Sequence, residues 1–305
     1  KLVAEAVAQA FGTTRDAVLA AYARLGDLGL VAAELAPAPS EAAGPTVTDV
    51  YDALWQIATV SGDGAVERKV GTFAGLLQRL DALSVKYLTR IPLGRLRLGV
   101  GDPTLLDAFS QAKCGDTRLR QALERAYNET SDLGLVARVF WTGGAAAVAQ
   151  IHAQVGKPLR PALAERLPSP EAVIAKLGCC AAEPKLDGFR CQVHKDGDHV
   201  RIFSRNLEDM SAMFPELIAG VRQQLRAQTA IVEGEAVAYH PESEEYLPFQ
   251  ETTKRRRKYG IAELAAALPL RLFLFDALHV DGEDLTPRPY RERRRRLEQL
   301  IVADT

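Results

Sequence analysis

The sequence predicts a multidomain chain in which an all-α first half is followed by a half of mixed α-helices and β-strands. With 305 residues, the chain is longer than one domain of ordinary size. Apolar residues recur at three- and four-residue spacings in the first half and at two-residue spacings in the second. Segments rich in proline, at residues 156–161 and 167–170, lie where the period changes. We therefore expect a domain boundary between residues 157 and 158.

The first helices are predicted from their apolar spacing. Residues 2–11 follow a helical period, and Gly12 ends the helix. Thr13, followed three residues later by Asp16, is typical of the N-terminal cap of a second helix. Residues 36–45 are rich in proline and are predicted to be a loop, after which the helical period resumes.

A twelve-residue pattern occurs twice in the helical half. Residues 21–32 and 126–137 are identical at eight of twelve positions, with an offset of 105 residues. This period is too long for a solenoid, so we interpret it as a duplicated helical unit that gives an approximately two-fold domain. Each copy contains an Asp-Leu-Gly turn, at Asp27 and at Asp132. Such a turn is more typical of an ordinary helix–helix connection than of a phosphate-binding loop.

The total charge does not indicate a nucleic-acid partner. Charged residues make up 25% of the chain and the net charge is −1, so DNA or RNA would have to be bound by local patches. Two basic clusters are present, at residues 254–258 and 291–296. The second is interleaved with Glu292 and followed by Glu298, which favours a solvated helix face.

The four cysteines do not have the spacing of a zinc site, and we expect buried thiols in a reducing cytosol. The sequence shows neither a membrane-spanning run nor a signal peptide, so we expect a cytoplasmic protein without a membrane partner. Because the first residue is lysine rather than methionine, we expect the chain to be a piece of a longer protein.

The second half is predicted to be mixed α and β. Apolar and polar residues alternate in 189–195 and again in 200–204, on either side of an Asp-Gly turn, which predicts a β-hairpin. Further strands are predicted at residues 230–239 and 270–277, with helices between them.

Residues 183–190 carry the pattern Glu-x-Lys-x-Asp-Gly-x-Arg, and Lys185 within it is a candidate nucleophile. A lysine amine attacks phosphorus only after it loses its proton, so it needs cationic neighbours or a metal that favour the neutral amine. Arg190 and Arg205 are candidates for these cationic neighbours and for binding phosphates. Lysines beside Asp-Gly turns are common, so the interpretation needs support from the rest of the chain.

Two carboxylates on one strand are the best independent indication of a site. Glu233 and Glu235 share a face of the strand predicted at 230–239, because side chains alternate along a strand. Carboxylates in an apolar strand need a sugar hydroxyl, a metal or an arginine as partner, unless that face of an edge strand lies in water. Phe275, near the end of the strand at 270–277, is placed where its ring can stack on a base, although core packing is the usual role of such a residue.

Several segments resemble, in order and spacing, those of ATP-dependent DNA ligases. The first four nucleotidyltransferase motifs of that family are similar to residues 183–190, 203–206, 233–235 and 275–282. Residues 247–250 and 255–259 resemble segments of the archaeal-type ligases and their bacterial relatives. Residues 94–99 and both Asp-Leu-Gly turns resemble the helical domain that precedes the catalytic core in these ligases. The resemblance covers nearly the whole chain.

The resemblance implies a fold. Residues 1–157 would form an all-α helical DNA-binding domain with an internal pseudo-repeat. Residues 158–305 would form an α+β nucleotidyltransferase (adenylation) domain with antiparallel sheets. Later family motifs, Glu-Gly-x-x-x-Lys and Lys-x-Lys, do not occur before Thr305. We therefore expect this domain to be truncated at its C-terminal end and the family's C-terminal OB-fold domain to be absent from the chain.

The resemblance also implies an activity and its cofactors. Lys185 would form a covalent lysine–AMP with ATP, Glu183 would recognise the adenine amino group, and Phe275 would stack on the ring. AMP would then pass to the 5′-phosphate at a nick in duplex DNA, and the 3′-hydroxyl would displace it to seal the strand.

The remaining site residues are implied in the same way. Glu235 would bind the ribose and a divalent metal, Mg²⁺ or another cation, while Arg190 and Arg205 would hold ribose and phosphate. The partner would be nicked duplex DNA, bound by a monomer associated with the prokaryotic nucleoid. Sliding-clamp or repair partners are not readable from the sequence.

Two alternatives remain open. Within enzymes, the chain could be an RNA ligase or a capping-type nucleotidyltransferase, although neither normally carries the helical half. Outside enzymes, it could be a non-catalytic DNA-binding relic of the fold. Lys185, Asp187, Gly188, Arg190 and Glu235 are all present, which weakens the second alternative.

Overall fold

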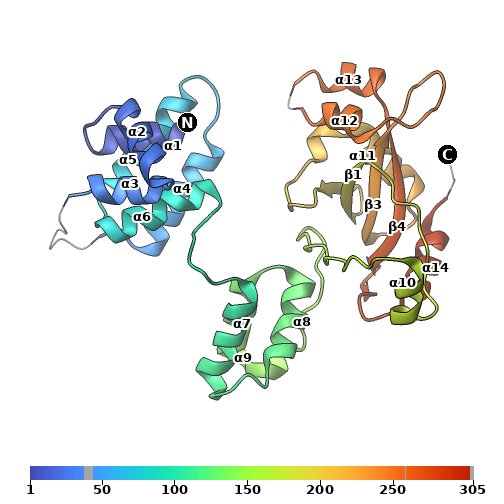
Figure 1. The fold of residues 1–305 in the computed structure, drawn as a ribbon. Coiled ribbons are helices and arrows are strands. Elements are labelled where there is room, and N and C mark those ends of the chain that lie inside the picture. Colours follow the sequence, from blue (N-terminus) through green and yellow to red (C-terminus); the bar gives the residue numbers. More distant parts are fainter. Residues whose placement is uncertain (38–43, 258, 303–305) are drawn as a thin grey trace. The chain divides into compact units, whose positions relative to one another are not determined.

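A computed structural model describes residues 1–37, 44–257 and 259–302. The chain divides into two compact units, Lys1–Val100 and Gly101–Thr305 (Figure 1). The predicted boundary between residues 157 and 158 stays a prediction. Most of the predicted loop at residues 36–45 lies outside the described residues, as does Lys258 of the first basic cluster.

The first unit is helical, as the apolar spacing predicted. Its helices are α1 (Leu2–Ala10), α2 (Arg15–Leu25), α3 (Leu28–Leu35), α4 (Val47–Thr59), α5 (Ala65–Leu77), α6 (Ala82–Arg90) and the short 3-10 helix η1 (Ile91–Leu93). Alanine, valine and leucine side chains of α1, α5 and α6 are central to its core. The predicted cap of α2 was wrong by one residue, because the Thr14 hydroxyl accepts the N–H of Ala17 at 3.2 Å.

The sequence repeat is a repeat of structure. The helices α2 and α3 begin at Arg15 and Leu28, and their counterparts α8 (Arg120–Thr130) and α9 (Leu133–Val148) begin 105 residues later in each case. The residue before the aspartate is left-handed in both copies, Gly26 with φ 66° and Ser131 with φ 54°. The helix pair of the repeat therefore recurs, whereas the expected two-fold domain stays a prediction. The two copies fall in different compact units.

The second unit begins with helices and continues into a sheet. Before the sheet lie α7 (Asp102–Cys114), α8, α9 with a break at Gly144, and α10 (Pro170–Leu177). The sheet and its connections are formed by β1 (Phe189–Asp196), β2 (His199–Phe203), η2 (Ser211–Met213), α11 (Pro215–Gln224), β3 (Thr229–Ala238), α12 (Phe249–Thr252), η3 (Thr253–Arg255), α13 (Ile261–Ala267), β4 (Leu270–Val280), β5 (Glu283–Asp284) and α14 (Tyr290–Leu300).

The five strands form one antiparallel sheet in the order β2-β1-β3-β4-β5. Figure 1 shows β1, β3 and β4 side by side, with α12 and α13 at one end of the strands. The hairpin predicted around the Asp-Gly turn is confirmed as β1 and β2. One face of the sheet packs on α11 and α14, with Cys191, Val232 and Leu297 fully buried between them.

The opposite face of the sheet is polar and carries the segment 151–160. Gln192 and His194 alternate with core residues along β1, so both point to this face. Gln192 accepts the N–H of Leu159 at 2.7 Å, and Nδ1 of His194 accepts the N–H of Gly156 at 2.8 Å. Leu159 also packs on Ile231 of β3. Side chains of the sheet therefore accept hydrogen bonds from backbone N–H groups of this segment.

Within the described parts of the chain, no helix combines the length and the apolar character that a membrane span requires. The expectation of buried thiols holds for Cys191 and is wrong for Cys179 and Cys180, which are exposed. Both follow the C-terminus of α10 and lie in a stretch, residues 174–185, that is exposed throughout.

Candidate active site

The loop that holds Lys185 lies directly against β3. The N–H of Gly188 donates to a carboxylate oxygen of Glu235 at 3.2 Å. A Cβ atom on Gly188 would lie 2.2 Å from the backbone oxygen of Ala236, so only glycine permits this approach. The side chain of Lys185, three residues before Gly188, is exposed. Its positive charge acts to lower the pKa of Glu235. The structure thus brings together Lys185 and Glu235, which the sequence predicted for one site.

Glu235 is a half-buried carboxylate. Burial raises its pKa above the ordinary value, while the Gly188 N–H, Arg190 and Lys185 act in the opposite direction. A half-buried carboxylate has lost part of its hydration. A cation that enters the site would compensate for this loss, so the carboxylate would attract it.

Glu233 has a different environment on the same strand face. Its side chain is 10% exposed, and its carboxylate accepts hydrogen bonds from Arg190 and, at 2.9 Å, from Gln192. The guanidinium of Arg190 also lies over the ring of Phe275, 4.6 Å from its centroid. The predicted sharing of one face by the two glutamates is confirmed. Only Glu235 is left with an oxygen directed to the Lys185 loop.

Glu183 and Phe275 are joined by a residue that the sequence did not single out. Tyr290, the first residue of α14, donates from its hydroxyl to Glu183 and lies 3.1 Å from the carbonyl oxygen of Phe275. Burial, followed by the Glu183 hydrogen bond, raises the pKa of Tyr290 to about 12. Tyr290 is therefore a neutral donor over the whole physiological range. No spacing in the sequence points to it, because the contact spans 107 residues.

Gln192 was also missed, although a signal for it exists. The two-residue period of β1 places Arg190, Gln192 and His194 on one face, whereas Cys191 and Val193 are buried in the core. Three polar residues at alternate positions of a strand indicate a polar face, and this face is the one that holds Glu233.

Each basic cluster contains an arginine that is engaged within the protein. Arg255 of the first cluster is buried and pairs with Glu216, so it is not a surface charge for a nucleic acid. In the second, the interpretation as a solvated helix face was wrong for Arg293. Its guanidinium binds both carboxylate oxygens of Asp276, at 2.8 and 2.9 Å. The reason is that α14 packs along β4, which brings Arg293 to the strand end.

Arg205 stands apart from the other predicted residues. It is exposed in the turn after β2, where the Ser204 hydroxyl accepts the N–H groups of Asn206 and Glu208, each at 3.2 Å. Within the described parts of the chain, Arg205 makes neither a hydrogen bond nor an ion pair. The structure does not join it to Glu235 or Phe275.

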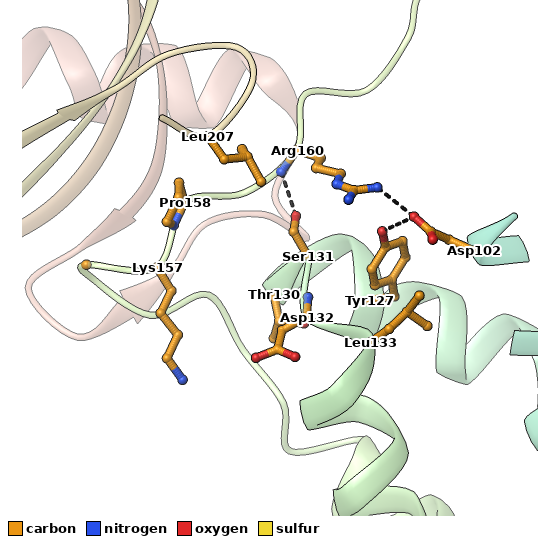
Figure 2. Close-up of a pocket in the computed structure, with 11 residues that line it drawn as sticks. Asp102, Tyr127, Thr130, Ser131, Asp132, Leu133, Lys157, Pro158, Arg160 and Leu207 are labelled. Carbon is orange, nitrogen blue, oxygen red and sulfur yellow. Dashed lines mark hydrogen bonds and ion pairs between the residues drawn. The ribbon is translucent and has the colours of Figure 1, made fainter. Parts of the chain in front are cut away.

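A cavity of about 490 Å³ lies beside the second Asp-Leu-Gly turn (Figure 2). Asp102 there accepts hydrogen bonds from the Tyr127 hydroxyl and, at 2.6 Å, from the guanidinium of Arg160. The backbone N–H of Arg160 donates to the Ser131 hydroxyl at 2.6 Å. Asp132 accepts the N–H of Leu135 at 2.8 Å and so caps its own helix. Such a carboxylate occupies a place that a phosphate would need, which favours the ordinary helix connection.

Two family models match separate parts of the chain. The family model described as "DNA ligase N terminus" matches residues 1–110, and the model described as "ATP dependent DNA ligase domain" matches residues 161–305. A probable DNA ligase of Dictyoglomus thermophilum is 49% identical over 302 residues, which are 99% of this chain and 52% of the relative. A DNA ligase of Aeropyrum pernix is 42% identical over an alignment of 318 positions, which covers 99% of this chain and 53% of the relative.

The chain therefore belongs to the family of ATP-dependent DNA ligases. It spans about half the length of the curated relatives that it matches. Among solved structures, the ligase domain of LigD from M. tuberculosis is 29% identical, with a TM-score of 0.31, over 39% of this chain and 36% of that chain.

Proposed function

We propose that this chain provides the adenylation domain and the DNA-binding domain of an ATP-dependent DNA ligase. Residues 158–305 would form the adenylation domain and residues 1–157 the helical DNA-binding domain. The observation that carries the proposal is the contact of the Lys185 loop with Glu235 through Gly188. Further support comes from the charge of the exposed Lys185, which acts on the half-buried Glu235, and from the hydrogen bond of Tyr290 with Glu183, two residues before Lys185.

In the first step, Nζ of Lys185 attacks the α-phosphorus of ATP. The new P–N bond forms as the bond to the bridging oxygen breaks, pyrophosphate leaves, and the amine gives its proton to solvent. Arg190 and Arg205 bind ribose and phosphate oxygens and offset the charge that develops on them. The AMP passes to a 5′-phosphate at a nick, and the 3′-hydroxyl displaces it as the strand is sealed.

Glu183 and Phe275 would recognise the base. The carboxylate of Glu183 accepts from the adenine amino group, and the ring of Phe275 stacks on the purine, with Arg190 already packed on that ring. Tyr290 fixes the position of Glu183 and is in this sense a positioning residue.

The residues also fit a divalent cation such as Mg²⁺. Magnesium is commonly held by one or two carboxylates together with substrate phosphates, and Glu235 offers a carboxylate that Arg190 does not neutralise directly. When bound, the cation would supply charge that draws electrons from the phosphates.

The test is covalent labelling with α-labelled ATP and Mg²⁺, followed on a denaturing gel. Lys185→Ala should abolish the label, whereas Lys157→Ala, which removes another exposed lysine, should keep it. The bond should be labile to acid, as a phosphoamide is. Label from GTP rather than ATP would favour a capping-type enzyme. If neither nucleotide labels the parent protein, the non-catalytic DNA-binding alternative gains.

DNA binding is tested separately, on a nicked duplex at several salt concentrations. We expect affinity to fall steeply as salt rises, because phosphate contacts release counterions. An affinity that does not depend on the salt concentration would contradict binding through the DNA phosphates.

A further inference from the structure

Three side chains from distant segments of the second unit converge away from the Lys185 loop. They are Glu129 near the end of α8, His152 in the segment after α9, and Asp284 of β5. One ligand atom from each lies within 4.8 Å of the others. Nδ1 of His152 is 3.1 Å from Oδ2 of Asp284 and 3.5 Å from Oε2 of Glu129.

Other groups hold the second oxygen of each carboxylate. Oδ1 of Asp284 accepts the N–H of Thr286 at 2.9 Å and its hydroxyl at 2.7 Å. Oε1 of Glu129 accepts from Arg125 at 3.3 Å. These donors leave Oδ2 and Oε2 directed at the histidine. An outer set of donors that orients ligating carboxylates is a usual feature of metal sites.

Glu129 supplies an independent indication. Its side chain is only 8% exposed, and within the described residues its Oε2 has no hydrogen-bond partner. The nearest charged partner of this buried oxygen is the imidazole of His152, 3.5 Å away. A buried carboxylate oxygen without a hydrogen bond is costly, and a cation between the three side chains would remove that cost.

We propose that Glu129, His152 and Asp284 bind one divalent transition-metal cation, of which Zn²⁺ is the best fit. One imidazole nitrogen and two carboxylate oxygens suit zinc, whereas Mg²⁺ and Ca²⁺ prefer oxygen ligands alone. Zinc–ligand distances of about 2.0–2.2 Å place tetrahedral ligands roughly 3.3–3.6 Å apart, close to the separations from His152. Water would complete the coordination.

The site ties the helical part of the second unit to its sheet. The cation would link α8 to β5 through the segment after α9, so it would stabilise this arrangement and raise the melting temperature. It shares no residue with the proposed nucleotide site. Metal binding and Lys185 labelling can therefore fail independently.

The experiment uses the chain after metal removal with a chelator. Cobalt(II) is titrated in as a spectroscopic substitute, and Zn²⁺ then competes for it. Cys179 and Cys180 are exposed thiols that can also bind these metals. The parent protein of this experiment and all its variants therefore carry Cys179→Ser and Cys180→Ser. His152→Ala is compared with His199→Ala, which removes an exposed histidine of β2. Asp284→Asn is compared with Glu283→Gln, which neutralises the exposed carboxylate next to it in β5.

We expect one cobalt per chain in the parent and in both controls. His152→Ala and Asp284→Asn should each weaken binding by at least about 10-fold, and Thr286→Val, which removes only the hydroxyl behind Asp284, by roughly 10-fold. Zinc should raise the melting temperature of the parent but not of His152→Ala. The proposal is overturned if the parent fails to bind stoichiometrically, or if the ligand variants bind as tightly as the controls.

Discussion

The hydroxyl of Tyr290 donates a hydrogen bond to the carboxylate of Glu183, across 107 residues of sequence. The same hydroxyl lies 3.1 Å from the carbonyl oxygen of Phe275. Since Tyr290 begins α14 and Phe275 lies in β4, the otherwise exposed Glu183 is fixed relative to two regular elements. This arrangement prepares the base-recognition side of the proposed nucleotide site.

Tyr290→Phe should raise the KM for ATP in the labelling reaction about 3- to 10-fold, the range expected for one hydrogen bond, with little change in kcat. The reason is that Glu183 keeps its charge but loses its fixed position. Tyr259→Phe is the control, because Tyr259 is 87% exposed. An unchanged KM in Tyr290→Phe would contradict the positioning role.

Gly188→Ala should remove labelling and destabilise the protein by about 1–3 kcal/mol, because its Cβ would meet the backbone of Ala236. Urea unfolding and labelling measure the two effects. Gly220→Ala is the matched control, since Gly220 lies in α11 with open space around its Cβ position. That change should leave labelling intact and stabilise the protein by up to about 1 kcal/mol. Normal labelling by Gly188→Ala would show that the loop does not need this approach.

The two strand glutamates should behave differently when changed to glutamine. Glu233→Gln should lower the free energy of unfolding by about 1–3 kcal/mol, because Arg190 and Gln192 lose a carboxylate partner.

Glu235→Gln should instead reduce labelling while the melting temperature at pH 7 stays equal or rises. Its folded pKa is raised, so ionised Glu235 detracts from stability at neutral pH. A large loss of stability in Glu235→Gln with normal labelling would reverse these assignments.

Acid should weaken the contact of segment 151–160 with the sheet. Burial lowers the pKa of His194 from 6.5 to about 3, with Arg201 adding to the effect. The folded pKa lies below the unfolded one, so the stabilisation is complete above pH 6.5 and is lost as the pH falls toward 3. Protonation of Nδ1 would also break its bond with the Gly156 N–H.

Between pH 7 and pH 5 we expect His194 to account for a loss of about 1–2 kcal/mol in the free energy of unfolding. Urea titrations at a series of pH values measure it. His194→Gln should show a shallower decline than the parent, and His199→Gln, at an exposed position, should not. Equal slopes in all three proteins would exclude His194 as the cause.

The sequence by itself determined the element types, the repeat and the motif positions. Apolar spacing at three and four residues requires helices with one buried stripe, as in α1 and α5, and alternation around the Asp-Gly turn requires the β1–β2 hairpin. The identical Asp-Leu-Gly turns start equivalent helices because an aspartate there caps the helix N-terminus in each copy. These are local constraints, which short stretches of sequence express.

Only the tertiary structure decided which of the candidate residues meet. Antiparallel pairing of β1 with β3 puts Arg190 opposite Glu235, and from there its side chain reaches Glu233. The close approach of Gly188 to β3 lets the Lys185 loop hydrogen-bond to Glu235. Packing of α14 on β4 brings Tyr290 to Glu183, and it partly buries Arg293 of a run that looked solvated and pairs it with Asp276. Such contacts join residues many positions apart, and they depend on the register and packing of whole elements rather than on any local spacing.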